Sequence, residues 1–359
     1  LKSIENEEGN TALWNWWVGY SYFFLKDFIS AKKCLLKAYE LDPDDEDVCD
    51  FLIGVYLSLA KIEDEKGNSE KALEYALESR KYVKNEQAEV DTESLIAWLY
   101  DRYMDYTKAE EILRSILAKN KENEWVLSEL GYCLSEQGKY EEAIEAFTQA
   151  KKWGRNDAWI NDEIGHCYKK KGDMKKALEF YLIAEKDNKK DPYLMSDIAW
   201  IYDGLGQYEE GLKYIKKAVK LGRDDAWLNE EYGACLAGLD RYEEAIEKYK
   251  YALNLDDEEK DEAYIYSQLG WCYRHLWNFE KALEYLNKAK ELGRKDVWIN
   301  VEMTLCYQNL EDYEKALEYA LIAYELDRND VHVLSELGVI YGCMEKYEEA
   351  LSFLLRAEK

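Results

Sequence analysis

The sequence predicts an all-α protein made of about ten repeated pairs of helices. Three observations lead to this fold class: small residues recur mostly every 34 residues, apolar residues follow helical spacing within each repeat, and only two prolines occur in 359 residues. The recurring small residues form a ladder at Gly19, Gly54, Ala97, Gly131, Gly165, Ala199, Gly233, Gly270, Thr304 and Gly338.

The repeats are expected to form one array over residues 1–359. They should begin near residues 12, 47, 90, 124, 158, 192, 226, 263, 297 and 331. A helix pair of this length cannot bury its apolar stripes alone, so neighbouring pairs should stack and share a continuous core.

Residues 158–191 illustrate one repeat. Ile160 and Ile164 lie on one face at helical spacing, which predicts a first amphipathic helix. Gly172 then breaks the helix, and Ala177 and Tyr181 mark the apolar face of a second helix. The short break between them predicts an antiparallel hairpin.

The links between repeats also follow a pattern. Gly-Arg-x-Asp occurs at 154–157, 222–225 and 293–296, where glycine can end one helix and aspartate can cap the next. The period slips at 61–70, where added residues either lengthen the helices of the second repeat or form a charged projecting loop.

This pattern resembles the tetratricopeptide repeat family from about Ala12 to Lys359. The family's glycine followed three residues later by tyrosine is matched at Gly19 and Tyr22 and at Gly165 and Tyr168, among other places. Two features differ, since the aromatic residue stands six rather than four positions before the glycine and the closing proline survives only at Pro43. The resemblance implies a right-handed α-α superhelix whose first helices line a concave groove.

Composition excludes several classes of function. A formal net charge of −27 disfavours nucleic acid and anionic membrane surfaces, which attract basic proteins. No stretch approaches the roughly 20 apolar residues of a spanning helix. We expect a soluble, cytoplasmic protein, and the start at Leu1 and the stop within an expected helix suggest a piece of a longer chain.

No catalytic, metal or cofactor motif is found. The three histidines lie in different repeats, and no Cys-x-x-Cys pair suggests zinc. Five of the eight cysteines stand two residues after the ladder, which favours burial as free thiols. We therefore expect no enzyme, no catalytic residue, no metal and no cofactor. The five are Cys133, Cys167, Cys235, Cys272 and Cys306.

Aromatic and basic residues on the first helices are the binding candidates, because residues that face away from the hairpin core would face the groove. The varied group near Trp200, Trp271, Arg274 and His275 is the favoured spot. The candidates are Trp98, Arg102, Trp125, Tyr132, Trp159, His166, Lys169, Tyr193, Trp200, Trp227, Trp271, Arg274, His275 and Trp298.

The recurring tryptophans have a second interpretation. Each ring can pack on its neighbouring repeat, over the arginine four residues earlier, as Arg155 can do for Trp159. Recurrence in every unit favours this packing, because each repeat must pack whereas a ligand need not touch every repeat.

The function favoured by these observations is a non-catalytic scaffold that binds a protein or peptide, and the negative charge favours a basic partner. The alternative is a peptide-sensing or regulatory module of a larger protein with its effector domain elsewhere. The dense aromatic residues of the first repeat, from Trp14 to Phe28, suggest that a further segment or a second copy covers that end, so a homodimer through the ends of the array is one expectation.

Overall fold

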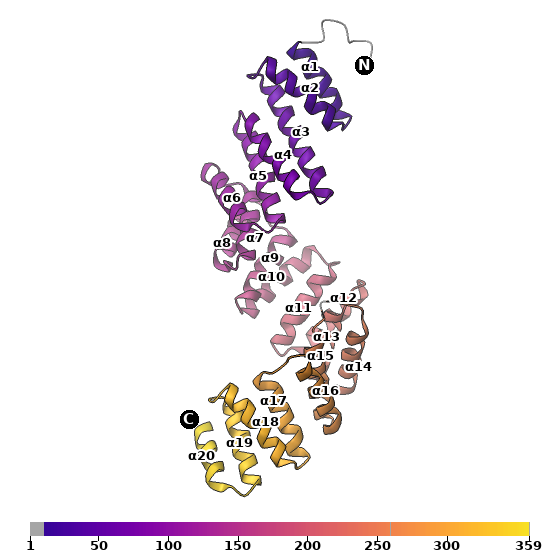
Figure 1. Cartoon of the computed structure of the whole chain (residues 1–359), viewed down its shortest axis with the longest axis vertical. Coiled ribbons are helices and arrows are strands. Elements are labelled where there is room, and N and C mark those ends of the chain that lie inside the picture. The colour runs from indigo at the N-terminus through magenta and orange to yellow at the C-terminus, as the bar shows by residue number, and fades with distance from the viewer. Residues whose placement is uncertain (1–10, 259, 359) are drawn as a thin grey trace. The chain divides into compact units, whose positions relative to one another are not determined.

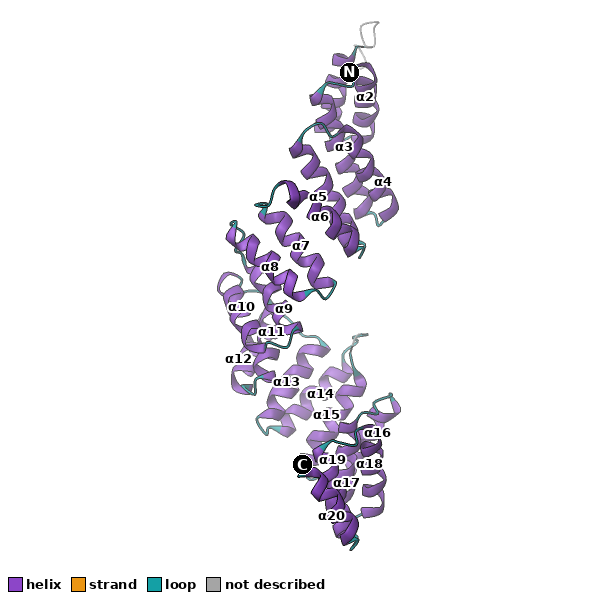
Figure 2. Cartoon of the chain, turned by 90° about the vertical axis from the view of Figure 1, so that its left-hand side faces the viewer, coloured by secondary structure: helices purple, strands orange, loops and turns teal. Residues whose placement is uncertain are grey.

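A computed structural model of the chain describes residues 11–258 and 260–358. These residues form twenty α-helices and one 3-10 turn, and no strand occurs among them (Figure 2). The chain divides into two compact units, unit 1 (residues 1–184) and unit 2 (residues 185–359).

Unit 1 contains consecutive helix pairs joined by short turns (Figure 1). Its elements are α1 (Ala12–Phe24), α2 (Phe28–Leu41), α3 (Glu46–Glu65), α4 (Ser69–Ser79), the 3-10 turn η1 (Arg80–Tyr82), α5 (Glu86–Arg102), α6 (Tyr106–Lys119), α7 (Glu124–Glu136), α8 (Tyr140–Lys152) and α9 (Ala158–Lys170). Helix α10 (Met174–Asp187) runs across the boundary between the units.

Unit 2 repeats the same arrangement, and each odd-numbered helix packs on the even-numbered helix that follows it. Its elements are α11 (Pro192–Gly204), α12 (Tyr208–Lys220), α13 (Ala226–Gly238), α14 (Tyr242–Asn254), α15 (Glu262–His275), α16 (Phe279–Glu291), α17 (Val297–Asn309), α18 (Tyr313–Leu326), α19 (Val331–Cys343) and α20 (Tyr347–Ala357). The predicted all-helical array of helix pairs is therefore confirmed.

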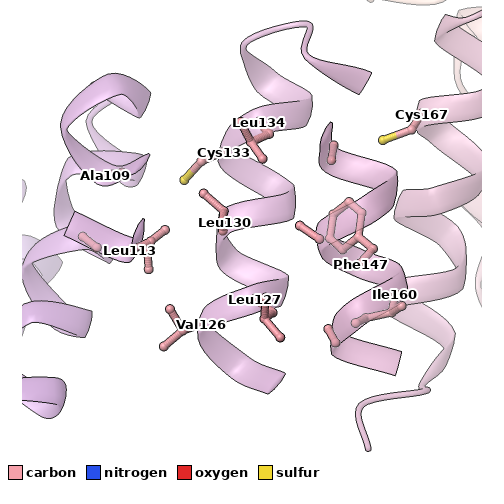
Figure 3. Packing of buried hydrophobic residues seen from close by; sticks show 14 of the residues in the cluster. Ala109, Leu113, Val126, Leu127, Leu130, Cys133, Leu134, Phe147, Ile160 and Cys167 are labelled. Carbon is pink, nitrogen blue, oxygen red and sulfur yellow. The ribbon is translucent and has the colours of Figure 1, made fainter. Parts of the chain in front are cut away.

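The small-residue ladder marks the closest approach within a hairpin. A Cβ atom added at Gly131 would lie 2.8 Å from the ring of Phe147, and one at Gly165 would lie 2.6 Å from the ring of Tyr181. Both rings are buried, and Phe147 belongs to a core cluster that spans α5 to α9 (Figure 3). Glycine is thus required where a large ring of the second helix crosses the first helix.

The five ladder-associated cysteines are buried, as predicted, and all eight cysteines are free thiols. Burial raises the pKa of the Cys167 thiol to about 11, so this thiol is neutral and unreactive at neutral pH. Cys133 and Cys167 both belong to the α5–α9 cluster, and Figure 3 shows Cys133 beside Leu130 and Leu134 and Cys167 on α9.

The predicted helix caps are confirmed at the Gly-Arg-x-Asp links. The backbone N–H of Ile160 donates to Asp157 at 2.9 Å, and that of Leu228 donates to Asp225 at 2.8 Å. The glycine of each link has a positive φ, for example +123° at Gly154, which side chains rarely tolerate. These links set the start of α9, α13 and α17.

The added residues of the second repeat lengthen its first helix. Helix α3 has 20 residues, whereas α7 and α9 have 13 each. It ends at a turn in which Gly67 has a φ of +79°. Of the two alternatives left open by the sequence, lengthening is observed, but only in the first helix, because α4 has just 11 residues.

The first hairpin exposes several large apolar side chains. Trp17 is 53% exposed, Phe24 63% and Ile29 71%. Such apolar surface would suit either of the covers expected from the sequence, a further segment or a second copy.

Candidate functional site

A pocket of about 830 Å³ lies in unit 1 on the face made by consecutive first helices. Its lining comes from side chains between Leu57 and Glu65 of α3, from side chains between Gln87 and Arg102 of α5, and from Asn123 and Trp125 at the start of α7. We call it the α3–α5–α7 pocket. No second-helix residue contributes to its lining.

The extra length of α3 supplies part of this pocket. A first helix of 13 residues that began at Glu46 would end before Lys61, Asp64 and Glu65, which all line the pocket. The slip in the repeat period therefore has a structural result: it extends one wall of the pocket beyond the length that a regular repeat would give.

Asp64 fixes the side chains at one end of the pocket. Its carboxylate accepts hydrogen bonds from Arg102 Nε and from the Tyr103 hydroxyl, both at 2.9 Å, and its side chain is only 6% exposed. The guanidinium of Arg102 lies 5.4 Å from the centre of the Trp98 ring. This contact orders Trp98 as one apolar surface of the pocket.

The pocket brings together three of the predicted site residues, namely Trp98, Arg102 and Trp125. Trp125 is 39% exposed, so a large part of its ring is available to a ligand. Arg102 is paired with Asp64, so its charge is already neutralised within the chain. Leu57, Val90 and Leu95 add apolar surface.

A row of carboxylates continues along the first helices beyond the pocket. Burial raises the pKa of the Glu129 carboxyl on α7 to about 6; Arg155 opposes this shift and Asp101 on α5 adds to it. Burial also raises the pKa of Asp101, although the Cys133 thiol donates to its carboxylate at 3.3 Å. Sequence reasoning did not single out these acids.

The row extends to α9. Burial raises the pKa of Glu163 to about 8, and the neighbouring carboxylates Asp162, Glu136 and Glu129 contribute to this shift. Charges of one sign thus gather where water is partly excluded, which makes their anionic forms costly. We call Asp101, Glu129 and Glu163 the acid row.

The recurring tryptophans pack against arginine, as one of the two interpretations expects. The Arg155 guanidinium lies 4.6 Å from the centre of the Trp159 ring, and Arg223 lies 4.8 Å from that of Trp227. The same contact joins Arg294 to Trp298 at 4.7 Å. The packing interpretation is therefore supported by a direct contact in all three Gly-Arg-x-Asp links.

Each of these arginines also reaches a serine of the preceding first helix. Arg155 donates to Ser128, and the same pairing recurs 27 residues apart in the other two links. The other two pairs are Arg223 with Ser196 and Arg294 with Ser267. Sequence reasoning missed these serines, although their constant spacing from the arginines was a readable signal.

The intervening first helices use asparagine instead. Asn161 Nδ2 donates to the backbone carbonyl of Asp157, the residue just before α9, at 2.7 Å. In the same way, Asn229 donates to the carbonyl of Asp225 before α13, and Asn300 donates to that of Asp296 before α17. First helices therefore alternate between a serine type (α7, α11, α15) and an asparagine type (α9, α13, α17). The structural period is two repeats.

Three of the four residues favoured by the sequence, Trp271, Arg274 and His275, lie at the end of α15 and make contacts within the chain, whereas Trp200 lies on α11. Arg274 Nε lies 2.5 Å from the carboxylate of Glu302 on α17, whose side chain is 6% exposed. His275 stacks on Tyr242 with ring centres 4.9 Å apart, and Trp271 contacts His275 edge-on at 4.4 Å. Arg274 therefore serves the junction between α15 and α17.

The other predicted residues are distributed over both units. Tyr132 lies 6.3 Å from Trp159 between ring centres, and His166 and Lys169 lie half-buried on α9. In unit 2, Trp200 is half-buried on α11, whereas Tyr193 is 63% exposed with Arg223 4.5 Å from its ring. The α3–α5–α7 pocket gathers three of the candidates around one cavity.

Two further features are absent from residues 11–258 and 260–358. No group of three or more His, Cys, Asp or Glu side chains there could hold a metal ion. Over the same described ranges, none of the helices is long and apolar enough to span a membrane.

Comparison with known families gives five matches along the chain. Models described as tetratricopeptide repeat match residues 15–45, 104–161, 160–184, 194–225 and 224–295, which together make up more than half of the sequence. A search of the curated proteins gives no match.

Several solved structures are similar in fold. A tetratricopeptide repeat protein from Parabacteroides merdae has 16% identity and a TM-score of 0.53, with 76% of this chain and 99% of that chain covered. The Cut9–Hcn1 hetero-tetramer of the APC/C has 15% identity and a TM-score of 0.54, with 97% and 76% covered. PilW, a type IV pilus biogenesis factor, has 19% identity and a TM-score of 0.51, with 55% and 90% covered.

Proposed function

The chain belongs to the tetratricopeptide repeat family, and from this premise we propose that it is a non-catalytic scaffold that binds an extended segment of a partner protein along the first helices of unit 1. The observation that carries the proposal is the α3–α5–α7 pocket. Helix pairs of this family commonly serve protein interaction, and this pocket is large enough for one or two side chains of a peptide.

The composition of the pocket supports peptide binding. Trp98 and Trp125 offer stiff aromatic surface, which loses little conformational entropy on binding. Ser94, Gln87 and Asn123 add uncharged polar groups that can bond to a peptide backbone. A ligand site with apolar walls and a few polar groups is the usual arrangement for specific recognition.

Two matched substitutions test the proposal. Short peptides would be selected for binding from a random displayed library, and their affinity for the whole chain measured by calorimetry. Trp125→Ala removes an exposed ring from the pocket, whereas Trp153→Ala removes an equally exposed ring, also 39%, from the end of α8. We expect Trp125→Ala to weaken binding about tenfold or more and Trp153→Ala to leave it unchanged.

The proposal fails if selection enriches no peptide or if both substitutions have the same effect. Circular dichroism of each variant checks that the helices remain formed. A regulatory module of a larger protein would use the same pocket, so the measurement applies to both functions expected from the sequence. We also propose a cytoplasmic location and a basic partner. The acidic residues beside the pocket support the basic partner.

A further inference from the structure

Two equivalent junctions between first helices differ in charge at one of their two positions. Arg274 stands four residues after the ladder residue Gly270, and Glu302 stands two residues before the ladder residue Thr304. These two side chains form the ion pair between α15 and α17. At the junction between α5 and α7, the same two positions hold Asp101 and Glu129.

The α5–α7 junction therefore has a carboxylate where the α15–α17 junction has a guanidinium. Asp101 acts on Glu129 as a like charge, and the nearest cation to Glu129 is Arg155, with Nη1 at 3.8 Å. Arg155 is also bonded to Ser128 and Asp157 and stacked on Trp159. Its charge is shared among these partners, so the two acids are left with less compensation than Glu302 receives.

This acid pair lies next to the α3–α5–α7 pocket. Trp98 and Asp101 are three residues apart on α5, and Trp125 and Glu129 are four residues apart on α7, so both steps lead to a neighbouring position on the same helix face. One helical turn is about 5.4 Å. An extended peptide rises about 3.3 Å per residue, so two residues cover this distance and point their side chains to the same side.

We propose that the α3–α5–α7 pocket binds an extended peptide that places an apolar side chain between Trp98 and Trp125 and a lysine or arginine two residues away against Asp101 and Glu129. The inference rests on the proposed function and names its ligand class. The ligand's cation takes the place that Arg274 occupies at the α15–α17 junction. The carboxylates gain a counter-ion and the peptide gains a charge-assisted contact.

The charges around the pocket agree with this ligand. Arg102 is neutralised by Asp64, and the remaining charged groups of the lining are Lys61, Glu65 and Asp91. With Asp101 and Glu129 added, acids outnumber bases at the site. An acidic peptide would face repulsion there, whereas a basic one would also associate faster at low salt.

Fluorescently labelled peptides test the ligand class by anisotropy. One peptide carries leucine and lysine two residues apart, a second replaces the lysine by glutamate, and a third replaces the leucine by serine. We expect both replacements to weaken binding to the whole chain about tenfold or more. We expect the chain with Asp101→Asn and Glu129→Gln to bind the lysine and glutamate peptides with nearly equal affinity.

Asp101→Arg is a second, independent test of the proposed ligand class. It places a guanidinium opposite Glu129, as at the α15–α17 junction, and should abolish the preference for lysine. Glu141→Gln and Glu142→Gln on α8, both exposed, are the matched controls and should change nothing.

The outcomes separate the ligand class from the proposed function. Equal binding of the lysine and glutamate peptides, with both weakened by Trp125→Ala, would overturn the ligand class and leave the scaffold standing. A lysine preference that survives in the Asp101→Asn, Glu129→Gln chain would also overturn it. If none of the three peptides binds, the class is wrong, and the library selection decides the scaffold separately.

Discussion

The α5–α7 and α15–α17 junctions differ in how they use one pair of positions. At α15–α17, Arg274 and Glu302 neutralise each other, and both side chains are largely buried. At α5–α7, Asp101 and Glu129 oppose each other beside a pocket. The difference teaches that a repeat array can keep its backbone while one junction pairs its charges within the chain and another sets two carboxylates beside a pocket, where we propose that a ligand supplies the cation.

Breaking the α15–α17 ion pair should have the largest effect. Arg274→Met leaves the carboxylate of Glu302 buried without its partner, and burial already raises the pKa of Glu302. We expect the free energy of opening α15 and α17 to fall by about 3 kcal/mol. Hydrogen exchange of the amides in these helices measures it, because unfolding of a long array is not a single transition.

A double substitution is the control for this result. Arg274→Met with Glu302→Met removes both charges and should recover most of the loss, because no buried charge remains. A loss that is equal in the single and double variants would mean that the packing of Arg274, and not its charge, stabilises the junction.

Removing a charge from the acid row should stabilise the fold, whereas breaking the ion pair destabilises it. The pKa of Glu163 in the folded chain, about 8, lies above its ordinary value of 4.5. The folded state therefore keeps a proton that the unfolded chain releases, and stability falls as the pH rises from 4.5 towards 8. Glu163→Gln should stabilise unit 1 by about 2 kcal/mol at pH 8.5 and by nearly nothing at pH 4.5.

Hydrogen exchange of the α7 and α9 amides at the two pH values checks this expectation. Glu179→Gln on the exposed side of α10 serves as the control and should show no such pH dependence. A gain from Glu163→Gln that is the same at both pH values would contradict the assignment of the effect to a buried charge.

The smallest effect is expected at an ordinary surface pair. Lys288 Nζ lies 2.8 Å from the carboxylate of Glu284 on α16, one helical turn away and in contact with solvent. Water screens such a pair, so Glu284→Gln should leave the exchange rates of the α16 amides unchanged within error. Faster exchange of the α16 amides would show that solvent exposure does not explain the difference between this pair and the pair of Arg274 and Glu302.

Much of the fold could be predicted from the sequence, because it depends on local spacing. The ladder of small residues indicates where a large side chain of the second helix crosses, as Phe147 crosses at Gly131 and Leu286 at Gly270. The caps at Asp157 and its equivalents follow from residue type and position. These features need no knowledge of partners far along the chain.

The site was only partly predictable. Trp98, Arg102 and Trp125 were candidates because helical spacing gives the face on which a residue lies. The pocket itself depends on Asp64, 38 residues before Arg102, and on the choice of a longer helix over a loop at 61–70. The spacing of residues within one helix does not indicate which residue of a neighbouring helix each of them will contact.

The alternation of serine-type and asparagine-type first helices restricts how such a chain can be lengthened or shortened during evolution. Loss of a single repeat would bring two helices of one type together, so an arginine would lose its serine acceptor or a serine would meet no arginine. Duplication or loss of adjacent repeats in twos preserves every link. Relatives of this chain should therefore differ in length by even numbers of repeats between α7 and α17.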